Sequence, residues 1–257
     1  MVAWPRSGTI ASPVVDILSL VTGVVGSLMA EVIIVLVIIF ARRVRHPILA
    51  LRLANMLTRA GVSAFYTHRD DYKYRKAGAT IVAYLLSAKK TIDIVAIDLT
   101  YGRTTENVSA AIRKFITGES HRRVRVSLLD PASSAVPAAA TALAISADDL
   151  RKRITESLGH QFEARSQMTP DEQRRFEILV HDELPMGSAI LLDADDDHEG
   201  RIQIETKLSG APSSESFGFE ISGKRGTQAF YRRHQQSWDA VIRRSRPAVA
   251  AVATPTQ

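Results

Sequence analysis

The chain has 257 residues, of which 46% are hydrophobic and 23% charged, a composition that is ordinary for a globular protein. It contains no cysteine, which excludes a disulfide framework, thiolate metal ligands and a cysteine nucleophile. The net charge is +6 at pH 7, but aromatic residues make up only 6% of the chain and form no stripe with the basic ones, so nucleic acid is an unlikely ligand.

Residues 1–13 are expected to form a short extracytoplasmic tail, and the apolar run at residues 14–41 predicts a transmembrane helix. The hydrocarbon core of a bilayer is about 30 Å thick, and roughly 20 helical residues cross it. Lysine and arginine resist translocation, so the basic cluster after the run predicts a cytoplasmic side and contacts with lipid head groups. A cleaved signal peptide fits less well, because the apolar run is too long. The cluster contains Arg42, Arg43 and Arg45.

A stripe of small and polar residues repeats every four positions within this run and ends at Glu31. Small residues at that spacing let transmembrane helices approach closely, and polar ones hydrogen-bond across the contact. The stripe therefore predicts a homo-oligomer with Glu31 inside the helix contact. The alternative is a tolerated acid that reaches toward the membrane surface. The stripe consists of Ser19, Gly23, Ser27 and Glu31.

Residues 42–60 are predicted to form a juxtamembrane basic helix, opened by Pro47 and ended by Gly61. Beyond it, strands and helices alternate in the order that is typical of a βαβ unit with a parallel sheet. The predicted strands of this half are 62–66, 91–99 and 123–129, and the predicted helices are 77–87 and 107–116.

The alanine-rich stretch 132–147 predicts a packed helix, and Ser146 and Thr169 are expected to cap two further helices. The last third is predicted to be rich in strands and to close with a helix at 227–244. These strands are 175–180, 188–192, 201–207 and 217–221. The expected fold class is α/β, a mixed and largely parallel sheet flanked by helices, in one domain at 61–246 followed by a disordered tail at 247–257.

Several polar residues follow predicted strands and form the candidate ligand site. Ligands of open α/β sheets bind beyond the carboxyl ends of the strands. These side chains are therefore expected to line a pocket for an anionic ligand, although they could equally be ordinary polar loop residues. They are Arg69, Asp98, Tyr101, Arg103 and Asp130.

The acidic segment 193–200 (DADDDHEG) is interpreted as a solvated turn. Its spacing does not match an EF-hand, which needs a glycine at the sixth loop position and a glutamate at the twelfth. No histidine pair has the spacing of zinc ligands on a helix, so neither a metal nor a cofactor is expected.

The part of the chain beyond the membrane resembles the phospholipase D-like superfamily, in a single-copy bacterial form. The resemblance rests on the order of several segments over about 185 residues. They are 61–72, 88–94 (AKKTIDI), 123–131 (RVRVSLLDP), 184–202 and 230–238.

The resemblance implies a His-x-Lys-x4-Asp motif in active members, with a histidine that attacks phosphorus and a lysine that neutralises the oxyanion. This chain departs from the motif. His181, a weak candidate, has Glu183 at the lysine spacing, and matching Asp193 to the motif aspartate puts Met186 and Ser188 at the other two positions.

The expected function is a membrane-anchored, non-catalytic sensor or adaptor whose cytoplasmic domain binds an anionic ligand or a protein partner. Its expected location is the inner membrane of a bacterium, with the N-terminus outside, and analogy points to signalling or phage defence. One alternative is a membrane-bound phosphodiesterase or phospholipase with an unrecognised site. Another is an oligomeric effector that acts through its transmembrane helix.

Overall fold

The computed structural model describes residues 47–66, 81–99, 104–184, 187–206, 217–224 and 228–249. The predicted transmembrane helix, the stripe ending at Glu31 and the arginine cluster lie outside these residues. Within the described part of the chain, no helix is long and apolar enough to cross a membrane. The chain divides into two units, residues 1–54 and 55–257, and all that follows concerns the second, except for helix α2, which contains the boundary.

Helix α2 (Pro47–Arg59) begins at the proline from which the sequence predicts it. Gly61 follows the helix with a φ of 87°, in the left-handed region that glycine adopts without strain. The predicted glycine stop is therefore confirmed.

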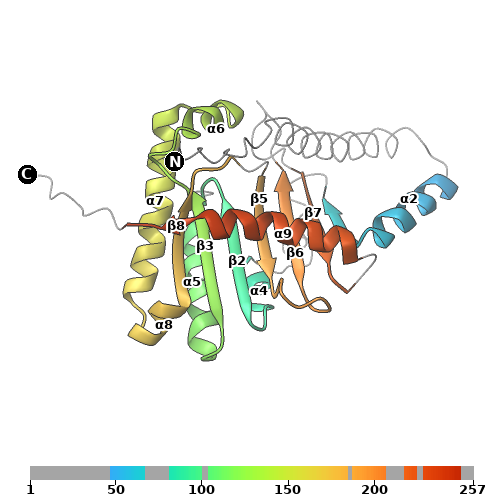
Figure 1. The fold of residues 1–257 in the computed structure, drawn as a ribbon, viewed down its shortest axis with the longest axis horizontal. Coiled ribbons are helices and arrows are strands. Elements are labelled where there is room, and N and C mark those ends of the chain that lie inside the picture. Colours follow the sequence, from blue (N-terminus) through green and yellow to red (C-terminus); the bar gives the residue numbers. More distant parts are fainter. Residues whose placement is uncertain are drawn as a thin grey trace, which may run out of the picture. The chain divides into compact units, whose positions relative to one another are not determined.

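A mixed sheet forms the centre of the domain, with strand order β1-β7-β6-β5-β2-β3-β4-β8 (Figure 1). Runs of β-branched residues produce its buried central strands, as predicted. The strands are β1 (Val62–Tyr66), β2 (Thr91–Ala96), β3 (Arg123–Leu129), β4 (Phe176–His181), β5 (Gly187–Leu192), β6 (Arg201–Thr206), β7 (Phe217–Ser222) and β8 (Arg246–Pro247).

The prediction of a largely parallel sheet is wrong. Only β2, β3 and β4 run parallel to one another, and every other neighbouring pair in the described sheet is antiparallel. For the strands that follow one another directly, β5, β6 and β7, the physical reason is the length of the connections. Parallel neighbours need a crossover of a dozen or more residues, whereas the turn at 193–200 reverses the chain between β5 and β6.

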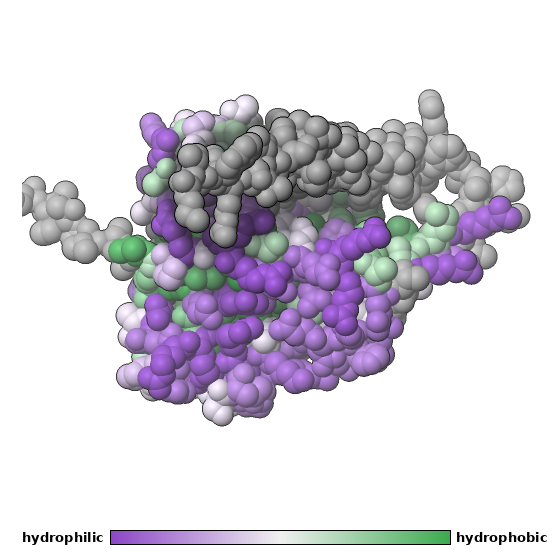
Figure 2. Space-filling view, viewed as in Figure 1, coloured by the Kyte–Doolittle hydropathy of each residue, from purple (hydrophilic) through white to green (hydrophobic). Residues whose placement is uncertain are grey.

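Helices cover both faces of the sheet. Ile92 and Ile94 of β2 belong to the main hydrophobic core, together with residues of α4, α5, α6 and α7. Successive strand side chains point to opposite faces, so Asp93 and Val95 face the other layer, where α9 crosses the strands (Figure 1). Hydrophilic residues cover most of the lower surface seen from that side (Figure 2). The helices are α4 (Ile81–Leu86), α5 (Thr104–Gly118), α6 (Val136–Ala142), α7 (Ala147–Ser166), α8 (Pro170–Arg175) and α9 (Gln228–Arg244).

The helix starts confirm the predicted caps. Ser146 accepts a hydrogen bond from the Asp149 amide of α7, and Thr169 forms a capping box with Glu172 at the start of α8. Helix α6 is shorter than the predicted 132–147, because the Ala132 amide is held by the Asp130 carboxylate in a turn before the helix.

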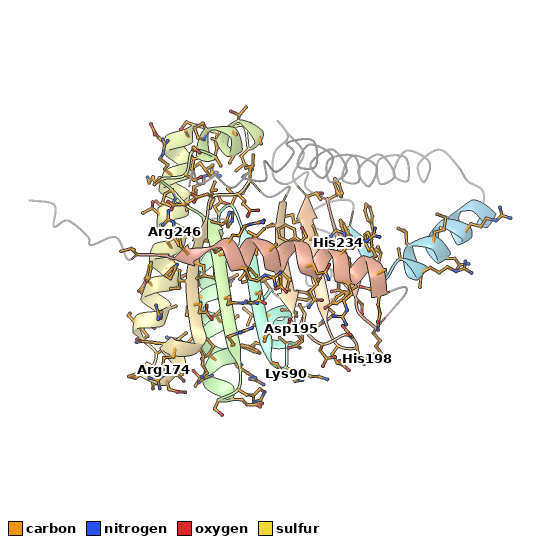
Figure 3. The ribbon with its side chains drawn as sticks, in the orientation of Figure 1. Lys90, Arg174, Asp195, His198, His234 and Arg246 are labelled. Carbon is orange, nitrogen blue, oxygen red and sulfur yellow. The ribbon has the colours of Figure 1, made fainter. Side chains whose placement is uncertain are left out.

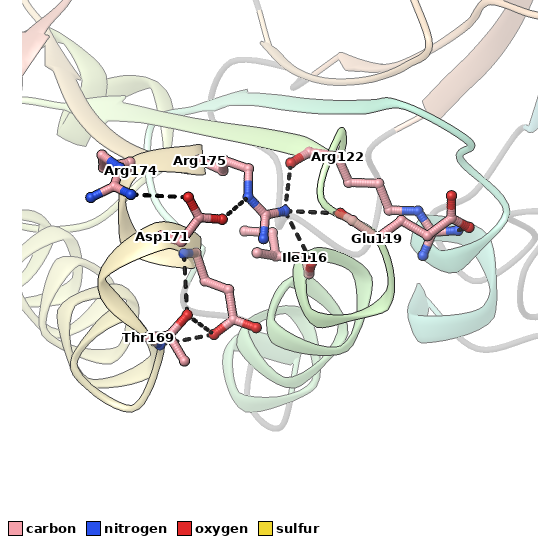
Figure 4. A network of polar contacts seen from close by, with 8 residues as sticks. Ile116, Glu119, Arg122, Thr169, Asp171, Arg174 and Arg175 are labelled. Atoms are coloured by element: carbon pink, nitrogen blue, oxygen red, sulfur yellow. Dashed lines mark hydrogen bonds and ion pairs between the residues drawn. The ribbon is translucent and has the colours of Figure 1, made fainter.

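Arg175 joins α8 to the end of α5 (Figure 4). Its Nη1 donates to the carbonyl oxygens of Ile116 at 3.1 Å, Glu119 at 2.9 Å and Arg122 at 3.1 Å. The last carbonyls of a helix lack partners within the helix, so this guanidinium caps α5. Its Nε lies 3.3 Å from an Asp171 carboxylate oxygen, which orients the side chain.

The prediction of a disordered tail from residue 247 is wrong for its first residues. Pro247 pairs with Leu179 of β4, and the Ala248 amide donates to the Ile178 carbonyl at 2.9 Å. The outer edge of β4 offers backbone groups that would otherwise lack partners, and this short segment satisfies some of them.

Candidate functional site

The carboxyl ends of β2, β3 and β4 meet at one edge of the sheet, as the strand pattern predicts. Ala96 pairs with Leu128, and Leu129 pairs with His181, so the residues that follow these strands lie at the same edge. We call this the carboxyl edge and define it as residues 97–99, 130–133 and 181–184. It contains Asp98 and Asp130, two of the five predicted ligand-site residues.

Asp98 follows β2 and is only 5% exposed. The next residue fixes the course of the loop, because the Leu99 amide donates to the Ser157 hydroxyl of α7 at 3.1 Å. Ser157 is fully buried within that helix. The loop that carries Asp98 is therefore tied to the helical layer at its described end.

Asp130 is buried and engaged on several sides. Its amide donates to the His181 carbonyl at 2.8 Å, and one carboxylate oxygen accepts from the Ala132 amide at 2.7 Å. The other carboxylate oxygen pairs with Arg246. The Asp130 carboxylate therefore links the end of β3 to the turn before α6 and to β8.

His181 ends β4 and is 2% exposed. Its Nε2 lies 3.2 Å from the Ala96 carbonyl oxygen and its Nδ1 lies 3.0 Å from that of Glu183. Burial is the main cause that lowers the pKa of the imidazole, which favours the neutral ring. Both nitrogens face backbone carbonyls, of which the single N–H of the neutral ring can bond only one, and the buried ring offers no nitrogen to solvent for attack on phosphorus.

His234 is also structural. It lies on α9 with its ring centroid 4.6 Å from that of Phe230 and 6.1 Å from that of Phe219. Burial lowers its pKa to about 4, so the ring is neutral near pH 7.

Two arginines close the carboxyl edge, Arg244 at the end of α9 and Arg246 at the start of β8, and the sequence does not predict their place there. Arg244 pairs with Glu183, and Arg246, which is labelled in Figure 3, pairs with Asp130. Between them, the Ser245 hydroxyl lies 2.7 Å from that of Ser127 on β3. In the sequence, basic residues gather at the end of the predicted helix 227–244. This pattern does not indicate which strand end these residues contact.

Arg69, Tyr101 and Arg103 lie outside the described residues, so their predicted role stays a prediction. The described carboxyl edge contributes mainly acids, and Arg244 and Arg246 supply the positive charge beside them. Among the described residues, no group of three or more carboxylate or histidine side chains could hold a metal ion.

Residues 60–219 match the model of a family described as a domain of unknown function, DUF5919. This span covers more than half of the chain. Among curated proteins, none is significantly similar in sequence.

Two solved structures are distantly similar. Nuc from Salmonella typhimurium, a phospholipase D family member, has a TM-score of 0.43 and 9% identity over 72% of this chain and 97% of that one. TrmBL2, described as an archaeal chromatin protein with a novel mode of DNA binding, has a TM-score of 0.42 and 8% identity over 91% of this chain and 68% of that one. With both scores below 0.5, neither likeness determines the activity of this chain.

Proposed function

The chain belongs to the DUF5919 family, and from its sequence and the geometry of its described residues we propose that it is a membrane-anchored, non-catalytic sensor or adaptor. In this proposal the domain is phospholipase D-like and binds an anionic ligand at the carboxyl edge. The order of the segments quoted from the sequence supports the phospholipase D-like assignment, and so does a mixed sheet with helices on both faces.

The state of His181 is the observation that carries the non-catalytic part of the proposal. A nucleophilic histidine needs a nitrogen that can reach phosphorus, and a lysine nearby to stabilise the oxyanion. His181 is buried against two carbonyl groups, and the residue at the lysine spacing is Glu183, which binds Arg244. The described carboxyl edge therefore lacks the machinery for phosphodiester cleavage.

The ion pairs at this edge support binding of an anion. The side chains of Arg244 and Arg246 are 65% and 57% exposed, although each pairs with a carboxylate. Exposed ion pairs are typically worth about 0–1 kcal/mol, so a ligand phosphate could compete at little cost for Arg244, whose partner Glu183 is 37% exposed. Arg246 pairs with the buried Asp130 carboxylate, so it would have to keep that partner while it binds a phosphate. Arg69 and Arg103 follow β1 and β2 in the sequence and would add two further cations.

We expect Arg69→Ala and Arg103→Ala each to weaken nucleotide binding by about 10- to 150-fold, since each would remove a charge-assisted hydrogen bond. The probes are adenosine and guanosine mono- and triphosphates, titrated calorimetrically into the purified full-length chain. The control is Arg174→Ala, an exposed arginine of α8 near the opposite edge (Figure 3). Unchanged affinity in the Arg69/Arg103 double variant would exclude the site. Hydrolysis of bis-nitrophenyl phosphate above background would favour the phosphodiesterase alternative.

The anchor proposal rests on the sequence of residues 14–45. The proposed helix places the N-terminus outside and Arg42, Arg43 and Arg45 on the cytoplasmic side, and it self-associates through the stripe that ends at Glu31. A carboxylate at the bilayer centre costs at least about 2.5 kcal/mol, which favours a buried, shared position. We therefore expect crosslinking in native membranes to give oligomers that both Glu31→Leu and Gly23→Leu reduce. The same crosslinked ladder in both variants would contradict the self-association.

A further inference from the structure

A polar cavity of about 250 Å³ opens at the opposite edge of the sheet, beside the turn at 193–200 between β5 and β6. Its lining includes three cationic side chains, two hydroxyls and one exposed acid. We call it the turn cavity. These residues are Lys89, Arg201, Lys224, Ser87, Ser222 and Glu199. Lys90 and His198 mark this edge in Figure 3.

Arg201 is held in place before any ligand arrives. Its Nη2 donates to the Ser87 hydroxyl oxygen at 2.7 Å, and its guanidinium carbon lies 5.5 Å from the centre of the Tyr84 ring. The Ser87 hydroxyl in turn donates to the Tyr84 carbonyl at 2.5 Å. A positioned guanidinium loses little freedom on binding and presents a planar set of donors suited to phosphate oxygens.

The backbone around Lys89 is equally well fixed. The Asp193 carboxylate accepts the amides of Lys89 at 2.7 Å and Lys90 at 2.6 Å. Asp196 accepts the His198 and Glu199 amides at 3.0 and 3.1 Å, and these bonds are the main cause that lowers its pKa. The floor and rim of the cavity are thus built from an ordered turn.

The charges at the cavity leave its cations accessible to a ligand. Asp193 directs its carboxylate to backbone amides, so it is occupied within the turn. The Lys89 Nζ lies 3.3 Å from a Glu199 carboxylate oxygen, and the two side chains are 64% and 48% exposed. An anion can therefore displace Glu199 from Lys89 at little cost. Lys224 is exposed, and it forms no ion pair with any residue that the structure describes.

We propose that the turn cavity binds the phosphate group of a small anionic ligand. Lys89, Arg201 and Lys224 would supply the positive charge, and the Ser87 and Ser222 hydroxyls would supply uncharged hydrogen bonds. Pockets for drug-sized ligands measure about 300–1,000 Å³, so this smaller cavity suits a single phosphate group rather than a whole nucleotide. The site lies at the other end of β2 from the carboxyl edge, and it does not depend on the function proposed there.

Calorimetric titration of the full-length chain with inorganic phosphate, and separately with adenosine monophosphate, tests the cavity. Lys224→Ala and Arg201→Gln should each weaken binding by about tenfold or more, as expected for a lost charge-assisted hydrogen bond. Glu199→Gln should tighten binding severalfold, because it removes the acid that competes for Lys89. A gain of affinity cannot come from damaged folding, so this variant separates the site from a structural effect.

The controls are Arg174→Gln and Lys152→Ala, exposed cations of α8 and α7 that belong to neither proposed site. Neither should change the affinity for phosphate. Loss of binding in Arg246→Ala with none in Lys224→Ala would overturn the turn cavity and support the carboxyl edge instead. Unchanged affinity in both Lys224→Ala and Glu199→Gln would also overturn it.

Cleavage of bis-nitrophenyl phosphate that His198→Ala abolishes would replace the binding site with a catalytic one. If adenosine monophosphate binds and inorganic phosphate does not, the site requires more than a phosphate group and the proposal fails.

Discussion

Asp193→Ala is expected to lower the free energy of unfolding by about 3–5 kcal/mol, because three backbone amides lose a charged acceptor at once. The carboxylate accepts the Lys89, Lys90 and Thr91 amides at 2.7, 2.6 and 2.9 Å and is 6% exposed. Asp193 also has a φ of 50°, a conformation that alanine adopts at a cost. Domains are stable by only about 5–15 kcal/mol, so this change removes a large part of the total.

Asp193→Asn separates the two causes. Asparagine tolerates the left-handed conformation and keeps one acceptor oxygen, but it brings an NH₂ group toward a backbone amide. We therefore expect an intermediate loss, and almost none for the exposed control Asp182→Ala. Urea denaturation followed by circular dichroism measures all three variants. A loss below about 1 kcal/mol for Asp193→Ala would show that water replaces the carboxylate at no cost.

Local patterns in the sequence predict the elements of this domain well. The β-branched run at 91–96 and the run at 123–129 form buried strands, and Ser146 and Thr169 cap helices at the expected places. Each of these features depends on neighbouring residues only. The sheet is different, because its mainly antiparallel pairing depends on which distant strands meet β2, and the pattern within one strand does not contain that information.

The functional surfaces were harder to predict for the same reason. Asp98 and Asp130 reach the expected edge, because parallel strands align their carboxyl ends. The pairing of Asp130 with Arg246 joins residues 116 positions apart, and no local pattern marks it. Asp193 resembles a motif aspartate in the sequence, yet in the structure its carboxylate organises a turn. Lys89 and Arg201 meet at one cavity only because β2 and β5 are neighbours.

The second large effect is expected between the sheet and α9, where Asp93 and Arg125 form a bidentate ion pair. The Arg125 Nε and Nη2 donate to the two carboxylate oxygens at 2.6 and 2.8 Å, and the side chains are 5% and 15% exposed. Asp239 of α9 lies 3.7 Å from the same guanidinium. Removing one partner of a buried pair costs about 3–5 kcal/mol, because the remaining charge is left without compensation.

Arg125→Ala should therefore destabilise the domain more than Asp93→Ala. It leaves the Asp93 and Asp239 carboxylates without the cation between them, whereas in Asp93→Ala the Arg125 guanidinium still has Asp239 as a partner. The double variant Asp93→Leu/Arg125→Met should recover most of the loss, because a packed apolar pair of similar volume is often neutral. Urea denaturation of the three variants measures these differences. Equal losses in the single variants, with no recovery in the double variant, would show that packing rather than charge determines the effect.

The loss of stability in Arg125→Ala should depend on pH, in a direction that a loss of packing alone would not produce. Burial is the main cause that already raises the pKa of Asp239, and Arg125, more than Arg243, is the cation that opposes this rise. Without Arg125, Asp239 should bind a proton still more tightly in the folded chain than in the unfolded one. A folded-state pKa above the unfolded value of about 3.9 means that stability is lost as the pH rises through the raised pKa and regained as it falls. The deficit of Arg125→Ala relative to the natural chain should therefore be smaller at pH 4.5 than at pH 7. A deficit that is the same at both pH values would mean that Asp239 does not depend on Arg125 for its charge.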